Sequence, residues 1–86
     1  MSEIVEKFYH ETPYPMCTYY FDDGIRVELW LELMVFVVYK NDGTVKCSGT
    51  YELNWEGDTV IEYDGVFDMP WSVCQALRDY GYKVVL

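Results

Sequence analysis

The clearest pattern in this sequence is a long alternation of apolar and polar positions in the middle of the chain. Every odd-numbered residue from Ile25 to Tyr39 is apolar, and the charged residues Arg26, Glu28 and Glu32 occupy even-numbered positions. Alternation with a period of two is typical of a β-strand, and a strand of this length needs a bend or a bulge. A helix is the rival interpretation for the second half of the stretch, but the β-branched valines there disfavour it.

A second strand is predicted over residues 44–53, after a turn at residues 41–43 whose sequence, Asn-Asp-Gly, favours a hairpin. The apolar residues of this strand again fall mainly at odd-numbered positions. A three-residue loop with Gly43 in the left-handed conformation pairs Tyr39 with Val45 and keeps these side chains on one face of the sheet. A two-residue loop would mix the two faces. We therefore predict the three-residue loop, with odd-numbered residues of both strands opposite one another.

Weaker patterns mark the regions on either side. Residues 16–21 are rich in strand-forming side chains and lead into an Asp-Asp-Gly turn, and residues 59–63 predict a third strand of a meander. Residues 1–15 predict an N-terminal arm or a short helix packed on the sheet. Pro13 and Pro15 stop any helix that begins near the N-terminus, because each disfavours helical geometry in the residue before it.

A helix is predicted over residues 68–80. Asp68 stands where a helix start favours a capping acceptor, and Pro70 stands where the first turn tolerates a proline. Apolar side chains then recur at the spacing of one helical face, and Gly81 is a natural C-terminal end. Residues 82–86 predict a short terminal strand.

Together these elements predict a single domain, residues 1–86, of the α+β class. Its centre is an antiparallel β-meander of about four to five strands within residues 16–67, with the C-terminal α-helix packed on its apolar face. The composition supports a dense core, since 51% of the residues are hydrophobic and 19% are aromatic. A chain this short needs such large apolar groups to bury enough surface.

The even-numbered side chains define a second face of the predicted sheet, which one helix cannot cover. Either the N-terminal arm lies across this face, or the face binds a partner or a second copy of the chain, since apolar patches with polar rims mark such sites. Aromatic residues dominate the binding energy of such surfaces. One end of this face is acidic, with Glu28, Glu32 and Glu52, and its middle is apolar, with Trp30, Met34 and Phe36.

Net charge is the strongest functional indication. Fifteen acidic residues stand against six basic ones, which gives a net charge of −9. From Cys47 to Leu77 there is no Lys or Arg, although six acids fall there. Such a surface repels nucleic acid and anionic lipid and attracts basic partners. The alternative interpretation is that the charge only keeps an aromatic-rich small domain in solution.

The cysteines indicate a reducing compartment. Cys17, Cys47 and Cys74 are an odd number at wide spacings, unlike the disulfide framework of a small secreted domain. No N-terminal signal peptide is visible, because residues 2–7 are charged where an apolar segment should begin. We therefore expect a cytoplasmic protein of a bacterial or host cell, with reduced thiols.

No pattern of residues indicates an enzyme, a metal site or a cofactor site, and we expect none of the three. His10 is the only histidine, and nothing places it beside a cysteine for nucleophilic catalysis. The cysteines lack the close pairing of zinc ligands. An acid–base pair among the clustered carboxylates is the strongest catalytic option, but so short a chain has little room for both a pocket and a core.

The first functional hypothesis is a non-enzymatic inhibitor that blocks a basic, nucleic-acid-handling protein, with carboxylates standing where phosphates otherwise bind. This small, acidic, single-domain profile is similar to that of phage-encoded inhibitors of host defence nucleases, including anti-CRISPR proteins, and of immunity proteins that neutralise nuclease toxins. The similarity is one of class and rests on no motif. The partner-binding residues predicted under this hypothesis are Glu28, Trp30, Glu32, Glu52, Trp55, Glu56, Asp58, Glu62 and Asp64.

The second hypothesis is a structural or assembly module. In this interpretation the second face of the sheet forms a homodimer or subunit interface through Trp30, Met34 and Phe36, and the acidic segment has no part in binding. Direct nucleic-acid binding fits neither hypothesis, because the six basic residues are scattered among acids. Membrane insertion fits neither, because the most apolar stretch is far too short to span a bilayer.

Overall fold

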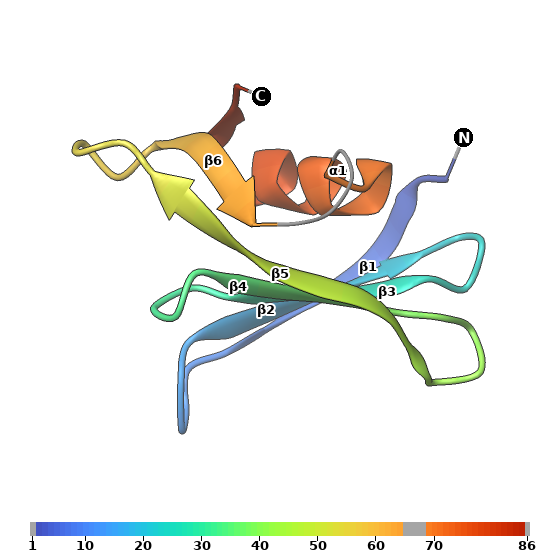
Figure 1. Ribbon diagram of the computed structural model, residues 1–86. Helices are drawn as coiled ribbons and strands as arrows, with labels where there is room; N and C mark the ends of the chain where they lie inside the picture. The colour runs from blue at the N-terminus through green and yellow to red at the C-terminus, as the bar shows by residue number, and fades with distance from the viewer. Residues whose placement is uncertain (1, 65–68, 86) are drawn as a thin grey trace.

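The structure, a computed structural model, describes residues 2–64 and 69–85, and of residues 62–64 only the backbone. Within these residues the chain forms seven strands in one curled sheet and one helix (Figure 1). The elements are β1 (Ile4–His10), β2 (Met16–Phe21), β3 (Arg26–Trp30), β4 (Val35–Tyr39), β5 (Val45–Leu53), β6 (Thr59–Asp64), α1 (Trp71–Tyr80) and β7 (Lys83–Val84).

The strands lie side by side in the order of the chain, from β1 at one edge of the sheet to β7 at the other. The pairs from β1–β2 to β5–β6 are antiparallel, whereas β6 and β7 are parallel. A parallel pair needs a crossover connection, and α1 lies in it. The sheet curls into a half-barrel, and α1 lies against its concave side (Figure 1).

The core fills the space between α1 and the concave side of the sheet. The helix buries Val73, Cys74, Ala76 and Leu77, which recur at the spacing of one helical face. Burial of a side chain of the size of Val or Leu contributes about 1.5–3 kcal/mol, so the sheet depends on this one helix for much of its stability. The strands contribute Cys17, Tyr19, Phe21, Val27, Leu29, Phe36, Val38, Tyr51 and Val60.

The predicted fold, an α+β meander of about four to five strands with a helix on one face, is wrong. The described sheet has seven strands, is mixed rather than antiparallel, and curls around the helix. The predicted N-terminal arm or short helix, residues 1–15, is mainly strand β1, which pairs with β2. Both prolines come after this strand, in the connection to β2, where they interrupt no ladder of hydrogen bonds.

The predicted long central strand is instead two strands, β3 and β4, joined by a tight turn. Trp30 pairs with Val35 across this turn, so an even-numbered residue of β3 shares a face with an odd-numbered residue of β4. The prediction of one apolar face made of odd-numbered residues is therefore wrong. Beyond the turn the even-numbered Phe36 and Val38 are the buried residues.

The β4–β5 hairpin agrees with the prediction at its tip and departs from it beyond the tip. Gly43 has a φ of 89°, and Tyr39 pairs with Val45, as the three-residue loop requires. A bulge then shifts the register, and Cys47 pairs with Val38 instead of an odd-numbered residue. This shift keeps the partly buried Cys47 against the core.

The ends of α1 also differ in part from the prediction. Pro70 occupies the N-cap position instead of the first turn, and no side chain caps the helix there. The predicted capping residue Asp68 lies outside the described residues. Gly81 has a φ of 119°, and its backbone N–H donates to the carbonyl of Arg78, which ends the helix as predicted.

A pair of glycine substitutions tests how tightly two hairpin turns pack. Gly24 has a φ of 88°, and a Cβ at this position would lie 2.7 Å from the Cβ of Asn41 in the β4–β5 turn. Gly43 has nearly the same φ but no atom within 4 Å of its Cβ position. Both Gly→Ala changes should cost about 1–2 kcal/mol for the left-handed backbone, and Gly24→Ala should lose roughly 1–3 kcal/mol more to the clash.

Urea denaturation followed by tryptophan fluorescence gives the two free energies of unfolding, with Gly43→Ala as the control for the backbone term. Equal losses in the two variants would show that the Gly24 and Asn41 turns do not constrain each other.

Candidate functional site

The hairpin between β5 and β6 presents an exposed tryptophan. Trp55 is 93% exposed, the highest value among the exposed large apolar side chains described. It lies in the loop of residues 54–58, which projects from the body of the sheet (yellow, Figure 1). A large aromatic side chain left in water is a ready anchor for a partner, since aromatic residues are enriched among those that dominate binding energy.

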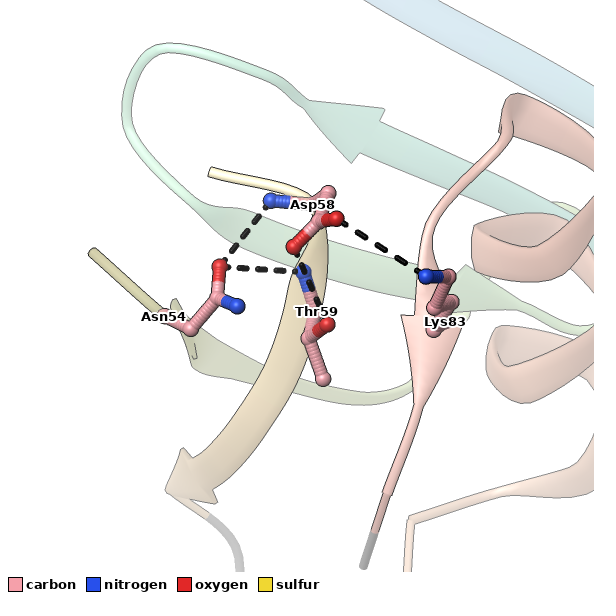
Figure 2. Close-up of polar contacts among 4 residues, drawn as sticks. All are labelled: Asn54, Asp58, Thr59 and Lys83. Carbon is pink, nitrogen blue, oxygen red and sulfur yellow. Dashed lines mark hydrogen bonds and ion pairs between the residues drawn. The ribbon is translucent and has the colours of Figure 1, made fainter. Parts of the chain in front are cut away.

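Hydrogen bonds hold the backbone of this loop in one conformation. The backbone N–H of Asn54 donates to the carbonyl of Thr59 at 2.7 Å, and that of Gly57 donates to the carbonyl of Asn54 at 2.9 Å. Gly57 has a φ of 82°, which a glycine adopts without steric cost. The side-chain oxygen of Asn54 accepts the N–H groups of Asp58 at 3.1 Å and Thr59 at 3.3 Å (Figure 2). Trp55 is therefore displayed on an ordered turn.

Asp58 is held at the base of the same loop. Its carboxylate accepts the hydroxyl of Thr59 at 3.1 Å and lies 3.9 Å from the ammonium of Lys83 (Figure 2). The side chain of Asn54 holds the pKa of Asp58 below its usual range, with smaller contributions from Thr59 and Lys83. The ion pair with Lys83 is solvent-exposed and contributes little to stability. It is one of the contacts of the Asp58 carboxylate at the base of the loop.

Two further acids flank the loop. Glu52 and Glu56 are exposed, and the described hydrogen bonds and ion pairs include neither side chain. In the β5–β6 register Glu52 pairs with Glu62, and Thr50 pairs with Asp64. We call residues 52–58 the acidic tryptophan loop.

The structure does not bring Glu28 into the predicted cluster with Glu52. Glu32 lies in the β3–β4 turn and is exposed. Glu28 pairs with Val37, which pairs with Ser48, so it lies well away from Glu52 along β5. The prediction was wrong because it treated residues 25–39 as one strand.

Glu28 instead belongs to a local contact on the convex face of the sheet. Its carboxylate accepts the hydroxyl of Tyr39 at 2.8 Å. The guanidinium carbon of Arg26 lies 4.1 Å from the centre of the Tyr39 ring, a cation–π contact. The hydrogen bond to Glu28 raises the pKa of Tyr39. The carboxylate of Glu28 is therefore already hydrogen-bonded within the protein. This makes Glu28 a weak candidate for contact with a partner.

The predicted apolar centre of the second face is also broken up. Phe36 is 2% exposed and lies in the core on the concave side, and Met34 lies in the β3–β4 turn, packed against the core. Trp30 stays on the convex face in a row with Met16 and Val35. The structure therefore keeps one of the three residues on the predicted face.

The candidate catalytic groups are kept apart. His10 pairs with Met16 and shares its face, whereas Cys17, the next residue of β2, points to the opposite face and is buried. Burial also raises the pKa of the Cys74 thiol, which makes it a poorer nucleophile. Among the described residues no three His, Cys, Asp or Glu side chains are grouped to hold a metal ion.

Comparisons with known proteins add no identification. No family model matches the sequence, and neither the search of curated proteins nor that of solved structures finds a match. The described part of the chain has no helix with the length and apolar character needed to cross a membrane.

The structure brings together Trp55, Glu56 and Asp58 as sequence neighbours, and the backbone of Glu62 and Asp64 lies on the adjacent strand. Sequence analysis missed Asn54 and Lys83, which hold the loop. An Asn at the first position of a turn with Gly three residues later is a recognisable turn signal and could have identified Asn54. Lys83 lies far along the chain, and no local pattern connects it to Asp58.

The pKa of Asp58 tests how the loop is held. The pKa of Asp58 is lower in the folded loop than its usual value, so the ionised carboxylate stabilises the loop. This contribution is fully present at pH values above the usual carboxyl pKa, and it is lost as the pH falls through the depressed pKa. Asn54→Ala should move the Asp58 pKa back up towards its usual range and reduce this pH-dependent contribution. Carboxyl ¹³C chemical shifts followed through a pH titration measure it.

Asp42 is the internal control for this titration. Its pKa is also depressed, but by Thr44 in the β4–β5 turn, and should not move in Asn54→Ala. An unchanged Asp58 titration curve in the variant would mean that the Asn54 side chain does not organise the carboxylate.

Proposed function

We propose that this protein is a non-enzymatic inhibitor that binds a basic, nucleic-acid-handling protein through the acidic tryptophan loop. The observation that carries the proposal is the combination of Trp55, 93% exposed, with flanking acids on a hydrogen-bonded turn. The partner classes are those expected from the sequence: a nuclease or another nucleic-acid-binding complex, with the protein acting in the manner of a phage anti-defence inhibitor or a nuclease immunity protein.

Order in the loop supports a binding role. A loop that becomes ordered only on binding loses conformational freedom at that step, which weakens the complex. Here the backbone of Asn54 to Thr59 is already fixed by hydrogen bonds in the free chain. Trp55 can therefore enter a pocket of a partner without further ordering of the backbone.

The charge around Trp55 selects the kind of partner. Glu52 and Glu56 are exposed, Asp58 is held ionised at the base of the loop, and no Lys or Arg occurs from residue 47 to residue 77. Complementary charge speeds association and selects against acidic partners more than it adds affinity. Proteins that bind nucleic acid use Lys and Arg side chains to contact the phosphates. The acidic tryptophan loop is complementary in charge to such basic surfaces.

An assembly module acting through the second sheet face is the alternative proposal. It is supported by Trp30, which lies in one row with Met16 and Val35 on the convex face. It is weakened by the burial of Phe36 and by the place of Met34 in a turn. We therefore rank it below the inhibitor.

Replacing the exposed tryptophan tests the anchor. Wild type and Trp55→Ala are immobilised in parallel, lysate of the source or host cell is passed over both, and retained proteins are compared by mass spectrometry. The retained basic protein is then titrated in solution with each variant. We expect Trp55→Ala to weaken binding by about 2 kcal/mol or more, roughly thirtyfold, with an unchanged unfolding midpoint because the side chain is already in water.

Trp71→Ala is the matched control, since Trp71 is 45% exposed but lies on α1. Loss of binding in Trp71→Ala with full binding in Trp55→Ala would place the site on the helix and reject the loop.

Charge reversal tests the acids separately from the anchor. Glu52→Lys/Glu56→Lys should weaken binding on the order of tenfold at physiological ionic strength and flatten its dependence on salt. Asp58 is left unchanged because its carboxylate holds the loop. The control, Glu3→Lys/Glu11→Lys, changes the net charge equally at two exposed positions in other parts of the chain. Equal binding by the two double variants would reject phosphate mimicry by the loop.

A further inference from the structure

The outer edge of β1 is a long and unprotected strand edge. β1 is the first strand in the sheet order, and within residues 2–64 and 69–85 no strand pairs with its outer side. It has seven residues, of which all but Ile4 are exposed. Natural sheets usually shorten, bend or cover such edges, because unpaired N–H and C=O groups are a template for another strand.

The hydrogen bonds of β2 establish which backbone groups of β1 are free. Phe21 exchanges hydrogen bonds with the β2–β3 turn, through Ile25 and Gly24, and the carbonyl of Pro15 accepts the N–H of Leu31. Odd-numbered residues of β2 therefore point their backbone groups towards β3, and even-numbered ones towards β1, because the direction alternates along a strand.

The even-numbered residues of β2 pair with Glu6, Phe8 and His10. The N–H and C=O groups of the intervening residues, Lys7 and Tyr9, consequently point away from the sheet. These are the groups that a further strand would meet.

A second copy of β1 fits this edge in a register that uses the strand from Glu6 to His10. If two β1 strands run antiparallel about a twofold axis at Phe8, Lys7 of each copy lies opposite Tyr9 of the other. Both residues offer N–H and C=O outwards, so each such pair can exchange two hydrogen bonds. Registers centred on Glu6 or Lys7 would place identical charges on the axis, which is unfavourable.

Side chains agree with the same register. On the convex face it sets Glu6 of one copy opposite His10 of the other, at both ends of the pairing, and Phe8 opposite Phe8 at the centre. Each Phe8 ring already stands edge-on to Tyr20, with centroids 5.8 Å apart, so the axis would join two aromatic pairs. The ammonium of Lys7 is held 2.8 Å from Asp79 of α1, on the opposite face, and does not obstruct the edge.

We propose that the protein forms a homodimer in which β1 pairs antiparallel with β1 of a second copy, about a twofold axis at Phe8, to make one continuous sheet. The proposal is independent of the proposed function, because the acidic tryptophan loop lies between β5 and β6, towards the other edge of the sheet. Each dimer would carry two such loops.

A cysteine at the axis tests the register. In Phe8→Cys the two new thiols would face each other in a pair that exchanges no backbone hydrogen bonds, with Cα atoms about 4.5 Å apart, within the range of a disulfide. Glu6→Cys is the matched control, since its two thiols would be four residues apart along the strands, about 13 Å. We expect rapid oxidation to a covalent dimer in Phe8→Cys only. Mass spectrometry of the digested dimer should identify two copies of the β1 peptide joined by a disulfide through the introduced thiols.

A proline at the edge tests the hydrogen bonds. Tyr9→Pro removes an N–H that points away from the sheet and leaves the β1–β2 hydrogen bonds in place, a position where edge strands tolerate proline. Tyr9→Ala removes the ring but keeps the N–H. We expect sedimentation equilibrium to give a dimer dissociation constant roughly tenfold or more higher in Tyr9→Pro than in Tyr9→Ala, because the dimer loses one hydrogen bond per copy. Circular dichroism checks that both variants are folded.

Trp30→Glu distinguishes this edge from the convex face and should leave the dimer unchanged. A wild type that stays monomeric up to about 100 µM, a concentration that populates any dimer with a dissociation constant of about 10 µM, would overturn the proposal. A dimer that Trp30→Glu dissociates and Tyr9→Pro does not would also overturn it, in favour of the convex face. Occupation of the edge by a strand of another protein, with no self-association, would overturn it as well.

Discussion

The whole structure depends on the contact between one short helix and the concave side of the sheet. α1 has ten residues and buries four of them, and the buried side chains of the strands meet these four in a single cluster. A small domain has few elements of secondary structure, and it must bury a large share of its apolar surface between them. A flat sheet would leave its outer strands out of reach of so small a helix, and the curl of the sheet brings them towards it (Figure 1). The same curl leaves the convex face and the outer edge of β1 without cover from the described chain.

The crossover that carries this helix also serves the acidic tryptophan loop. After α1 the chain returns beside β6 as β7, with Lys83 opposite Thr59 in the parallel pair. The backbone N–H of Lys83 donates to the carbonyl of Asp58 at 2.9 Å, and its ammonium lies near the Asp58 carboxylate. The base of the loop is thus tied to the end of the helix connection. The crossover from β6 through α1 to β7 therefore both packs the helix on the sheet and orders the acidic tryptophan loop.

The sequence predicted local elements better than the way they combine. The turn glycines, the C-terminal helix and most strand segments follow from residue type and spacing, because these depend on nearby residues. The β3–β4 turn, Leu-Glu-Leu-Met, has no Gly, Pro, Asn or Asp to mark it, so an apparently continuous strand concealed a hairpin. That one missed turn inverted the assignment of faces for Phe36 and Val38. β1 was missed because its apolar residues fit a short helix as well as a strand.

The same distinction separates the parts of the candidate site. Trp55, Glu56 and Asp58 could be predicted to act together because they share one turn, and no register error can separate them. The cluster of Glu28, Glu32 and Glu52 required correct pairing of three segments, and Glu28 was misplaced because one pairing was wrong. A site that is contiguous in sequence is therefore the more secure one to infer for this chain. The preference for the loop over the sheet face rests on this locality, on the 93% exposure of Trp55, and on the hydrogen bonds of Asn54 that keep the loop ordered without a partner.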